Sequence, residues 1–186
     1  MKIALVLSAA SLTVAMTACG KAPAPPPTTA VNAEAATPPA STKAETKSDP
    51  ALAACHATFK PSSGDKDVAA DVDALAKGCA DATKMKQMGT THSGEATDKS
   101  GWVTFPFPAA AGKCYRVYAV AQSTAQDTDL TLLDSTGALV ALDTSESNTP
   151  ILAEDGKLCF KVADAATLKL RIEAGGGKFA LQVWSD

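Results

Sequence analysis

The sequence predicts a mostly β fold: an antiparallel β-sandwich preceded by a short, disulfide-linked helical hairpin. Two observations predict it. Between residue 51 and about residue 88 the apolar residues recur at steps of three and four, as on one face of a helix. From residue 101 onward they alternate with polar residues, as in half-buried strands. We therefore assign residues 51–100 to a helical hairpin and loop, and residues 101–186 to the sandwich.

The segment before these regions is typical of a bacterial signal peptide. In residues 1–18, Lys2 is followed by an apolar run from Ile3 to about Met16, and small residues precede Cys19. The run is too short to span a bilayer. Its end, Met-Thr-Ala-Cys, resembles the lipobox of bacterial lipoproteins, with Met in place of the usual Leu. The resemblance implies cleavage before Cys19, lipidation of its sulfur and amino group, and attachment to a membrane.

The next residue bears on which membrane holds the lipid. Lipoproteins kept at the inner membrane commonly carry Asp after the cysteine, whereas this chain carries Gly20, so the resemblance implies the outer membrane, at its periplasmic or its surface face. The alternative is an ordinary secreted protein cut after Ala18. Both interpretations predict an exported chain in the cell envelope or beyond it.

Residues 19–50 follow as a tether. They contain seven Pro residues, and Ala, Thr, Lys and Glu fill most of the other positions. Such a stretch has no apolar period and cannot bury enough surface to offset its ordering entropy. The composition therefore predicts a disordered Pro- and Ala-rich linker that starts at the lipidated cysteine.

Two helices are predicted next. Asp49 and Pro50 are typical of a helix N-cap and first position, before a helix at residues 51–59. Asp65 or Asp67 can cap a second helix that extends to about Met88. Its apolar stripe comprises Val68, Val72, Leu75, Cys79, Ala82 and Met85. The stripe is too narrow to fold alone and is expected to pack on the sandwich. Residues 89–101 are predicted to form a long loop.

Seven strands are predicted after this loop, with turns such as Gly175–Gly177 between them. In the last three strands, the apolar side chains of each strand face one way, among them Leu158, Phe160 and Val162. On this alternation Cys114 and Cys159 lie on outer faces, with the basic residues. The predicted strands are Trp102–Phe107, Cys114–Gln122, Asp129–Asp134, Ala138–Asp143, Lys157–Ala163, Thr167–Glu173 and Lys178–Trp184.

Four cysteines remain besides Cys19, and export makes disulfides favourable. They allow three pairings. Cys79 lies on the helical stripe that faces the first helix, which carries Cys55, while Cys114 and Cys159 share a sheet face. We therefore predict the pairs Cys55–Cys79 and Cys114–Cys159.

The charge pattern excludes one class of partner and raises a metal hypothesis. The net charge is −3, from 17 basic and 20 acidic residues, and no basic stripe indicates nucleic-acid binding. Seven carboxylates and no Lys or Arg lie between residues 127 and 155. They are interpreted as solvated loops, with a calcium site as the alternative. The candidate ligands would be Asp127, Asp129, Asp134 and Asp143.

Four short runs together resemble the bacterial pre-peptidase C-terminal domain. They are Ala111–Val117, Asp127–Asp134, Gly137–Ala141 and Gly175–Val183, within residues 101–184. The resemblance implies a jelly-roll-like β-sandwich of an exported protein, with a role in binding, secretion or solubility. No peptidase domain accompanies it here. The arrangement of lipobox, tether, hairpin and sandwich also resembles envelope lipoproteins.

Catalytic and cofactor motifs are lacking in the sequence. It has two histidines, no Gly-x-Ser-x-Gly and no His-Glu-x-x-His. Cys55-His56 suggests haem attachment, with Met85 or Met88 as second ligand, but the first cysteine of Cys-x-x-Cys-His is missing. We predict no enzyme activity and no cofactor.

The predicted function is therefore binding. Tyr118 and Trp184 are large side chains on nominally outer faces, and aromatic residues contribute much of the energy at interfaces. The alternative is that the helical hairpin covers them. We predict a non-catalytic outer-membrane lipoprotein whose sandwich binds an envelope protein or an extracellular polymer. A structural or accessory subunit of an export or surface complex is the first alternative, and an exported hydrolase the second.

Overall fold

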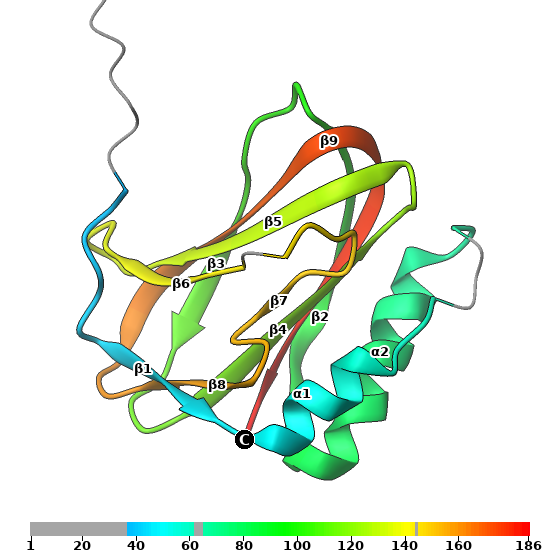
Figure 1. Ribbon diagram of the computed structural model, residues 1–186. Helices are drawn as coiled ribbons and strands as arrows, with labels where there is room; N and C mark the ends of the chain where they lie inside the picture. The colour runs from blue at the N-terminus through cyan, green and yellow to red at the C-terminus, as the bar shows by residue number, and fades with distance from the viewer. Residues whose placement is uncertain (1–36, 62–64, 144) are drawn as a thin grey trace, which may run out of the picture. The chain divides into compact units, whose positions relative to one another are not determined.

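The computed structural model describes residues 37–61, 65–143 and 145–186, and these residues form the helices and strands labelled in Figure 1. The predicted signal peptide, Cys19 and the first part of the tether lie outside them. The helices are α1 (Pro50–Ala57) and α2 (Val68–Thr83). The strands are β1 (Ala44–Ser48), β2 (Lys86–Thr97), β3 (Val103–Ala109), β4 (Cys114–Ala121), β5 (Ala125–Leu133), β6 (Leu139–Leu142), β7 (Ile151–Leu152), β8 (Gly156–Phe160) and β9 (Asp164–Ser185).

The strands pair antiparallel in one folded sheet. The order is β1-β8-β4-β9-β5-β6, with β2 and β3 also paired to β9 and β7 paired to β4. The first half of β9 pairs with β3 and β5, and its second half pairs with β2 and β4. β9 is thus shared by the two layers of the sandwich. The predicted mostly β, antiparallel class is confirmed.

The prediction of a turn between two final strands is wrong, because β9 is continuous from residue 164 to residue 185. It bends at Gly175, whose φ is +87°. A Cβ built there would lie 2.0 Å from the backbone oxygen of Thr124, on the neighbouring chain segment. Glycine is therefore required by both the conformation and the space. The glycines bend one strand between layers instead of ending it.

The predicted helix end and loop between residues 84 and 97 are also wrong. α2 ends at Thr83, where Lys84 adopts a left-handed conformation with φ +56°. β2 then pairs with the second half of β9, from residue 86 to residue 97. It carries few apolar residues because it is an edge strand. Gly94 faces Phe179, whose ring occupies the place of a Cβ at 2.7 Å.

The last part of the predicted tether is ordered. β1 pairs with β8 along five residues, and Ser41 donates a backbone hydrogen bond to Leu139 of β6 at 2.7 Å. Residues 39–48, which we call the strap, therefore run from one layer of the sandwich to the other (Figure 1). Backbone pairing, rather than burial of apolar side chains, orders this segment, and so its composition did not reveal it.

The helical prediction is otherwise confirmed. Asp49 caps α1 by accepting a hydrogen bond from the backbone of Ala51, and Asp67 caps α2 by accepting one from Ala70. Two disulfides form, Cys55–Cys79 between the helices and Cys114–Cys159 between β4 and β8. Both predicted pairings are correct.

The apolar residues form two clusters. One fills the space between the layers, with Phe107, Tyr115, Leu130, Leu170 and Leu181 among its members. The other joins the helices to the outer face of β4 and β9; its members are Val68, Val72, Leu75, Ala76, Cys79, Met85, Tyr118, Val120, Ile151, Ala180 and Trp184. Val68, Val72, Leu75, Cys79 and Met85 of the predicted helical stripe are therefore buried. Val162 departs from its predicted inward position and is 48% exposed, since β8 ends at residue 160.

Candidate functional site

The aromatic residues predicted to bind a ligand are not accessible. Tyr118 is 1% exposed and Trp184 is 6% exposed. The Arg116 guanidinium lies over the Tyr118 ring at 5.2 Å, and the indole N–H of Trp184 donates to Gln182 at 2.9 Å. The helices need an apolar partner and cover both rings, so the alternative interpretation is the correct one.

The haem hypothesis fails on its ligands. Cys55 is in a disulfide, and Met85 is 4% exposed in the cluster under α2. His56 instead contacts the backbone oxygen of Thr149 at 3.3 Å, and His92 packs against the ring of Phe105 at a centroid distance of 5.1 Å. Both histidines therefore contact groups of the sandwich.

The calcium candidates occupy different environments. Asp134 lies in a polar network described below, whereas Asp127 and Asp129 lie on β5. Asp143 follows β6 and accepts from the Ser145 hydroxyl at 3.1 Å. Among the described residues, no three His, Cys, Asp or Glu side chains gather closely enough to hold a metal ion. The four candidates of the calcium alternative therefore do not form one ligand group.

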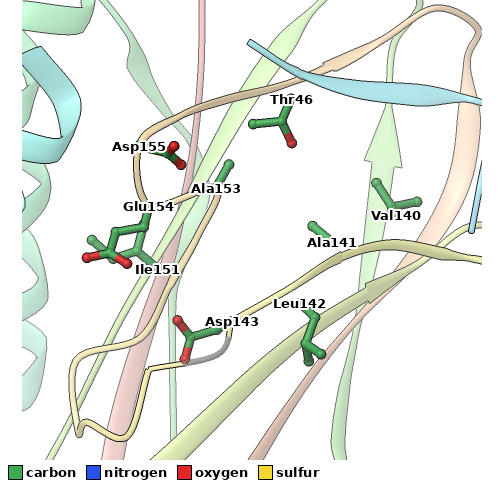
Figure 2. Close-up of a pocket in the computed structure, with 9 residues that line it drawn as sticks. All are labelled: Thr46, Val140, Ala141, Leu142, Asp143, Ile151, Ala153, Glu154 and Asp155. Carbon is green, nitrogen blue, oxygen red and sulfur yellow. The ribbon is translucent and has the colours of Figure 1, made fainter. Parts of the chain in front are cut away.

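A lateral pocket of about 330 Å³ opens at the edge of the sandwich, between β6, the strap and the connection from β7 to β8. In Figure 2, Glu154 and Asp155 lie on one side of the opening, while Val140, Ala141 and Leu142 lie along β6 on the other. The residues that line it are Thr46, Val140, Ala141, Leu142, Asp143, Ile151, Ala153, Glu154 and Asp155.

Several polar contacts fix the connection between β7 and β8, whose residues Glu154 and Asp155 form the rim of the pocket. Ala153 has a φ of +56°, and its carbonyl accepts from Gly156 at 2.9 Å. From beneath, the Nη2 of Arg116 donates to the Glu154 carbonyl at 2.9 Å. His56 of α1 lies 3.5 Å from the Glu154 carboxylate, between Nδ1 and Oε1. A strand and a helix thus position the rim from within the protein.

The lining of the lateral pocket is acidic. It contains three carboxylates, those of Asp143, Glu154 and Asp155, and no Lys, Arg or His. Burial raises the pKa of Asp143 above its ordinary value, against hydrogen bonds that lower it. Arg116 is fully buried, and its Nε and Nη1 have no hydrogen-bond partner within the described structure. Burial lowers the pKa of Arg116.

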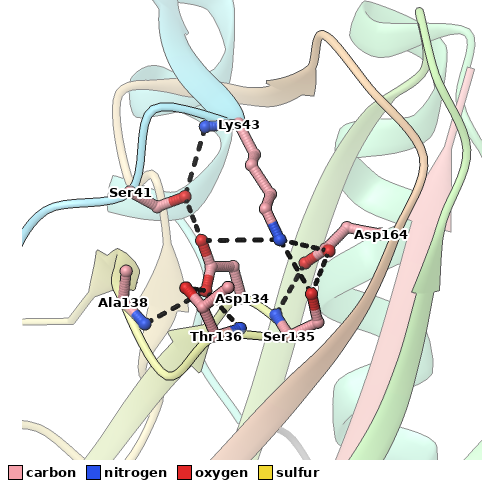
Figure 3. A network of polar contacts seen from close by, with 7 residues as sticks. All are labelled: Ser41, Lys43, Asp134, Ser135, Thr136, Ala138 and Asp164. Carbon is pink, nitrogen blue, oxygen red and sulfur yellow. Dashed lines mark hydrogen bonds and ion pairs between the residues drawn. The ribbon is translucent and has the colours of Figure 1, made fainter.

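A second group of carboxylates is fully engaged by donors (Figure 3). Asp134 accepts from Ser41 at 2.7 Å and from Thr136 Oγ1 at 2.6 Å, and further from the Thr136 and Ala138 backbone. Lys43 Nζ lies 2.6 Å from Asp164 and 3.8 Å from Asp134. The hydrogen bond from Thr136 is the largest effect that lowers the pKa of Asp134. These contacts, which we call the strap network, link Ser41 and Lys43 of the strap to the turn after β5 and to Asp164 at the start of β9.

Two exposed apolar side chains, Trp102 and Leu142, were not predicted from the sequence. Trp102 is 37% exposed beside β3, with the Arg171 guanidinium 4.5 Å from its ring centroid. Leu142 is 45% exposed and lines the lateral pocket. The excess of carboxylates between residues 127 and 155 was visible in the sequence, but not which of them gather at a pocket. No helix among the described residues has the length and apolarity needed to cross a membrane.

Comparison with known proteins found similarity only among solved structures, at low sequence identity. No family model matches it, and no curated protein is significantly similar in sequence. Among solved structures, it is similar to the pre-peptidase C-terminal domain of a Bacillus anthracis collagenase, with 16% identity, a TM-score of 0.38, and coverage of 52% of this chain and 89% of that domain.

Two further structures share a similar extent of the chain. For PliG of Aeromonas hydrophila, a periplasmic lysozyme inhibitor, the identity is 11%, the TM-score 0.34, and the coverage 55% of this chain and 86% of PliG. For the Drosophila NLP core, the identity is 10%, the TM-score 0.29, and the coverage 54% of this chain and 99% of that core.

Proposed function

We propose that this protein is a non-catalytic lipoprotein of the cell envelope that presents its β-sandwich as a binding module on a Pro- and Ala-rich tether. The partner would be an envelope protein or an extracellular polymer, and the anchor would be Cys19 in the outer membrane. The observation that supports binding most directly is the lateral pocket. It is concave and acidic, and contacts from Arg116 of β4 and His56 of α1 hold its rim.

The location rests on separate observations. The sequence before Cys19 has the features of a lipoprotein signal, and the two disulfides fit a protein that matures outside the reducing cytosol. The strap then marks where the tether would join the folded domain, since β1 pairs with β8 just before α1 begins.

Crosslinking in intact cells, followed by purification of the full chain, tests the binding role. Recovery of a dominant protein or of a polymer would support the proposal. Recovery of no partner, together with turnover in a panel of hydrolase substrates, would contradict it. Fractionation tests the location, because Cys19→Ala should release the chain from the membrane fraction. A free thiol at Cys19 in the unsubstituted protein would rule out the lipid anchor.

A further inference from the structure

We infer that the lateral pocket receives a cationic side chain, Lys or Arg, presented by a partner protein. The inference rests on the proposed binding role and specifies the chemistry of that site. It combines three observations that are independent of one another: a cavity of suitable size, carboxylates without an opposing cation in its lining, and an exposed apolar side chain at its edge.

The size and composition of the pocket suit such a group. A volume of about 330 Å³ is at the lower end of the range for ligand sites, roughly 300–1,000 Å³. Val140, Leu142 and Ile151 contribute apolar lining beside the carboxylates. Lys and Arg have an aliphatic stem and a charged end, so they can contact both kinds of surface at once.

The nearby basic residues of the protein are already engaged or lie outside the lining. Arg116 is fully buried and donates to a backbone carbonyl of the rim. Lys43 contacts Asp134 and Asp164 in the strap network. His56 lies near Glu154 from the side of α1, at 3.5 Å. The negative charge of the pocket thus remains complementary to a cation that comes from outside.

Leu142 adds an indication that does not depend on charge. It is one of three large apolar side chains that are exposed among the described residues, and the other two lie outside this pocket. Exposed apolar surface next to a concave site is typical of an interaction surface. A bare metal ion would not use it, and the described carboxylates do not form a metal-ligand group. An organic cation with an aliphatic stem uses both features.

Nuclear magnetic resonance titration of the ¹⁵N-labelled full chain, carrying Cys19→Ala, tests the inference. The probes are arginine and lysine with blocked termini, and the matched controls are blocked citrulline and blocked acetyl-lysine, which lack the charge. The cationic probes should shift the amides of residues 140–143 and 151–155, and the uncharged controls should not. Equal shifts from the uncharged controls, or none from the cations, would overturn the inference.

Substitutions of the two rim residues, Glu154 and Asp155, test whether the rim carboxylates bind the cation. Glu154 and Asp155 are exposed, so Glu154→Gln/Asp155→Asn should fold normally and weaken binding about tenfold, since the variant removes two modest ion pairs with the cation. Glu95→Gln/Asp98→Asn removes the same charge from the exposed surface at β2 and should change affinity less than twofold. Equal weakening by both pairs would indicate only general attraction to an acidic protein and would overturn the site.

A titration with spermidine, a free polyamine, distinguishes a small-molecule ligand from a side chain of a partner protein. If spermidine binds in the pocket and the blocked amino acids do not, the partner assignment is wrong and the ligand is a small molecule. If no cation binds but crosslinking in cells still recovers a partner, this inference fails while the proposed binding role stands.

Discussion

The strap network and the lateral pocket both contain carboxylates from neighbouring parts of the chain, but these carboxylates differ in burial and in hydrogen bonding. Asp134 and Asp164 are 3% and 4% exposed in their side chains, and donors from the strap and the turn after β5 engage them. Glu154 and Asp155 are exposed at the rim of a pocket whose lining contains no basic residue. Both sets are acidic, but Asp134 and Asp164 are buried among several donors, whereas Glu154 and Asp155 are exposed to solvent.

This difference indicates that one group of acidic residues stabilises the fold and that the other is available for binding. A carboxylate that receives several hydrogen bonds contributes to the stability of the folded state and resists protonation. An exposed carboxylate at the rim of an open pocket contributes little to stability and remains available to a ligand. Substitutions should therefore affect folding in the strap network and binding at the lateral pocket.

The largest effect on stability is expected from Asp134→Ala. It leaves the Ser41 and Thr136 donors without their acceptor and should lower the free energy of unfolding by about 3 kcal/mol, as for other buried charge-assisted hydrogen bonds. Urea denaturation measures the change. A loss below about 0.5 kcal/mol would show that the network does not hold the strap.

Lys43→Met should have a smaller effect, a loss of about 1–2 kcal/mol, because the substitution keeps the aliphatic stem and removes the charge that contacts Asp164. Lys47→Met on β1 is the matched control. The Lys47 side chain is 61% exposed, and its variant should change stability by less than about 0.5 kcal/mol. The comparison fails if the two variants are equally destabilised.

Lowering the pH should reduce the stabilising contribution of Asp134 and Asp164 and relieve the destabilising contribution of Asp143. The pKa values of Asp134 and Asp164 are lowered, the latter because hydrogen bonds from Lys43 and Ser135 outweigh its burial. Their stabilising contribution is present above the unfolded pKa of about 3.9 and is lost as the pH falls below it. Burial raises the pKa of Asp143, so its protonation recovers stability as the pH falls through its folded pKa toward about 3.9.

Urea midpoints between pH 7 and pH 2.5 measure both effects. Asp134→Asn should flatten the loss below about pH 4, and Asp143→Asn should remove the gain above it. If Asp134→Asn leaves the acid limb unchanged, the network is not the source of acid sensitivity.

The smallest effect on stability is expected at the rim. Glu154→Gln/Asp155→Asn should change the free energy of unfolding by less than about 0.5 kcal/mol, since both residues are exposed. Denaturation of this variant beside Asp134→Ala compares the two groups directly. A loss at the rim as large as that at Asp134 would make these carboxylates structural.

The parts of the fold that bury apolar side chains were predictable. The stripe of α2, the alternation in β8 and in both halves of β9, and the disulfide pairs all follow from the spacing of a few residue types. β1 and β2 were not predictable, because these polar edge strands are held by backbone pairing to β8 and β9. The glycines at residues 175–177 predict a turn between two strands, whereas the structure has a bend within β9, since glycine permits both conformations.

The site was less predictable than the fold. Alternation placed Tyr118 and Trp184 on an outer face correctly, but it does not reveal that helices cover that face. The lateral pocket is assembled from β1, β6 and the connection after β7, which are far apart in the sequence. An excess of carboxylates marks the region, and only the tertiary pairing shows which of them share an opening.

Photocrosslinking of the full chain in its own cells tests the central proposal most directly, with the photoreactive residue placed at Leu142 or, as a control, at Val162. Both positions are exposed, at 45% and 48%, but only Leu142 lines the lateral pocket. We predict a distinct adduct from position 142 whose yield falls several-fold, up to about tenfold, with Glu154→Gln/Asp155→Asn, and no such adduct at position 162. The same adducts at both positions, or an undiminished adduct at 142 in the rim variant, would contradict the proposal that this pocket binds the partner.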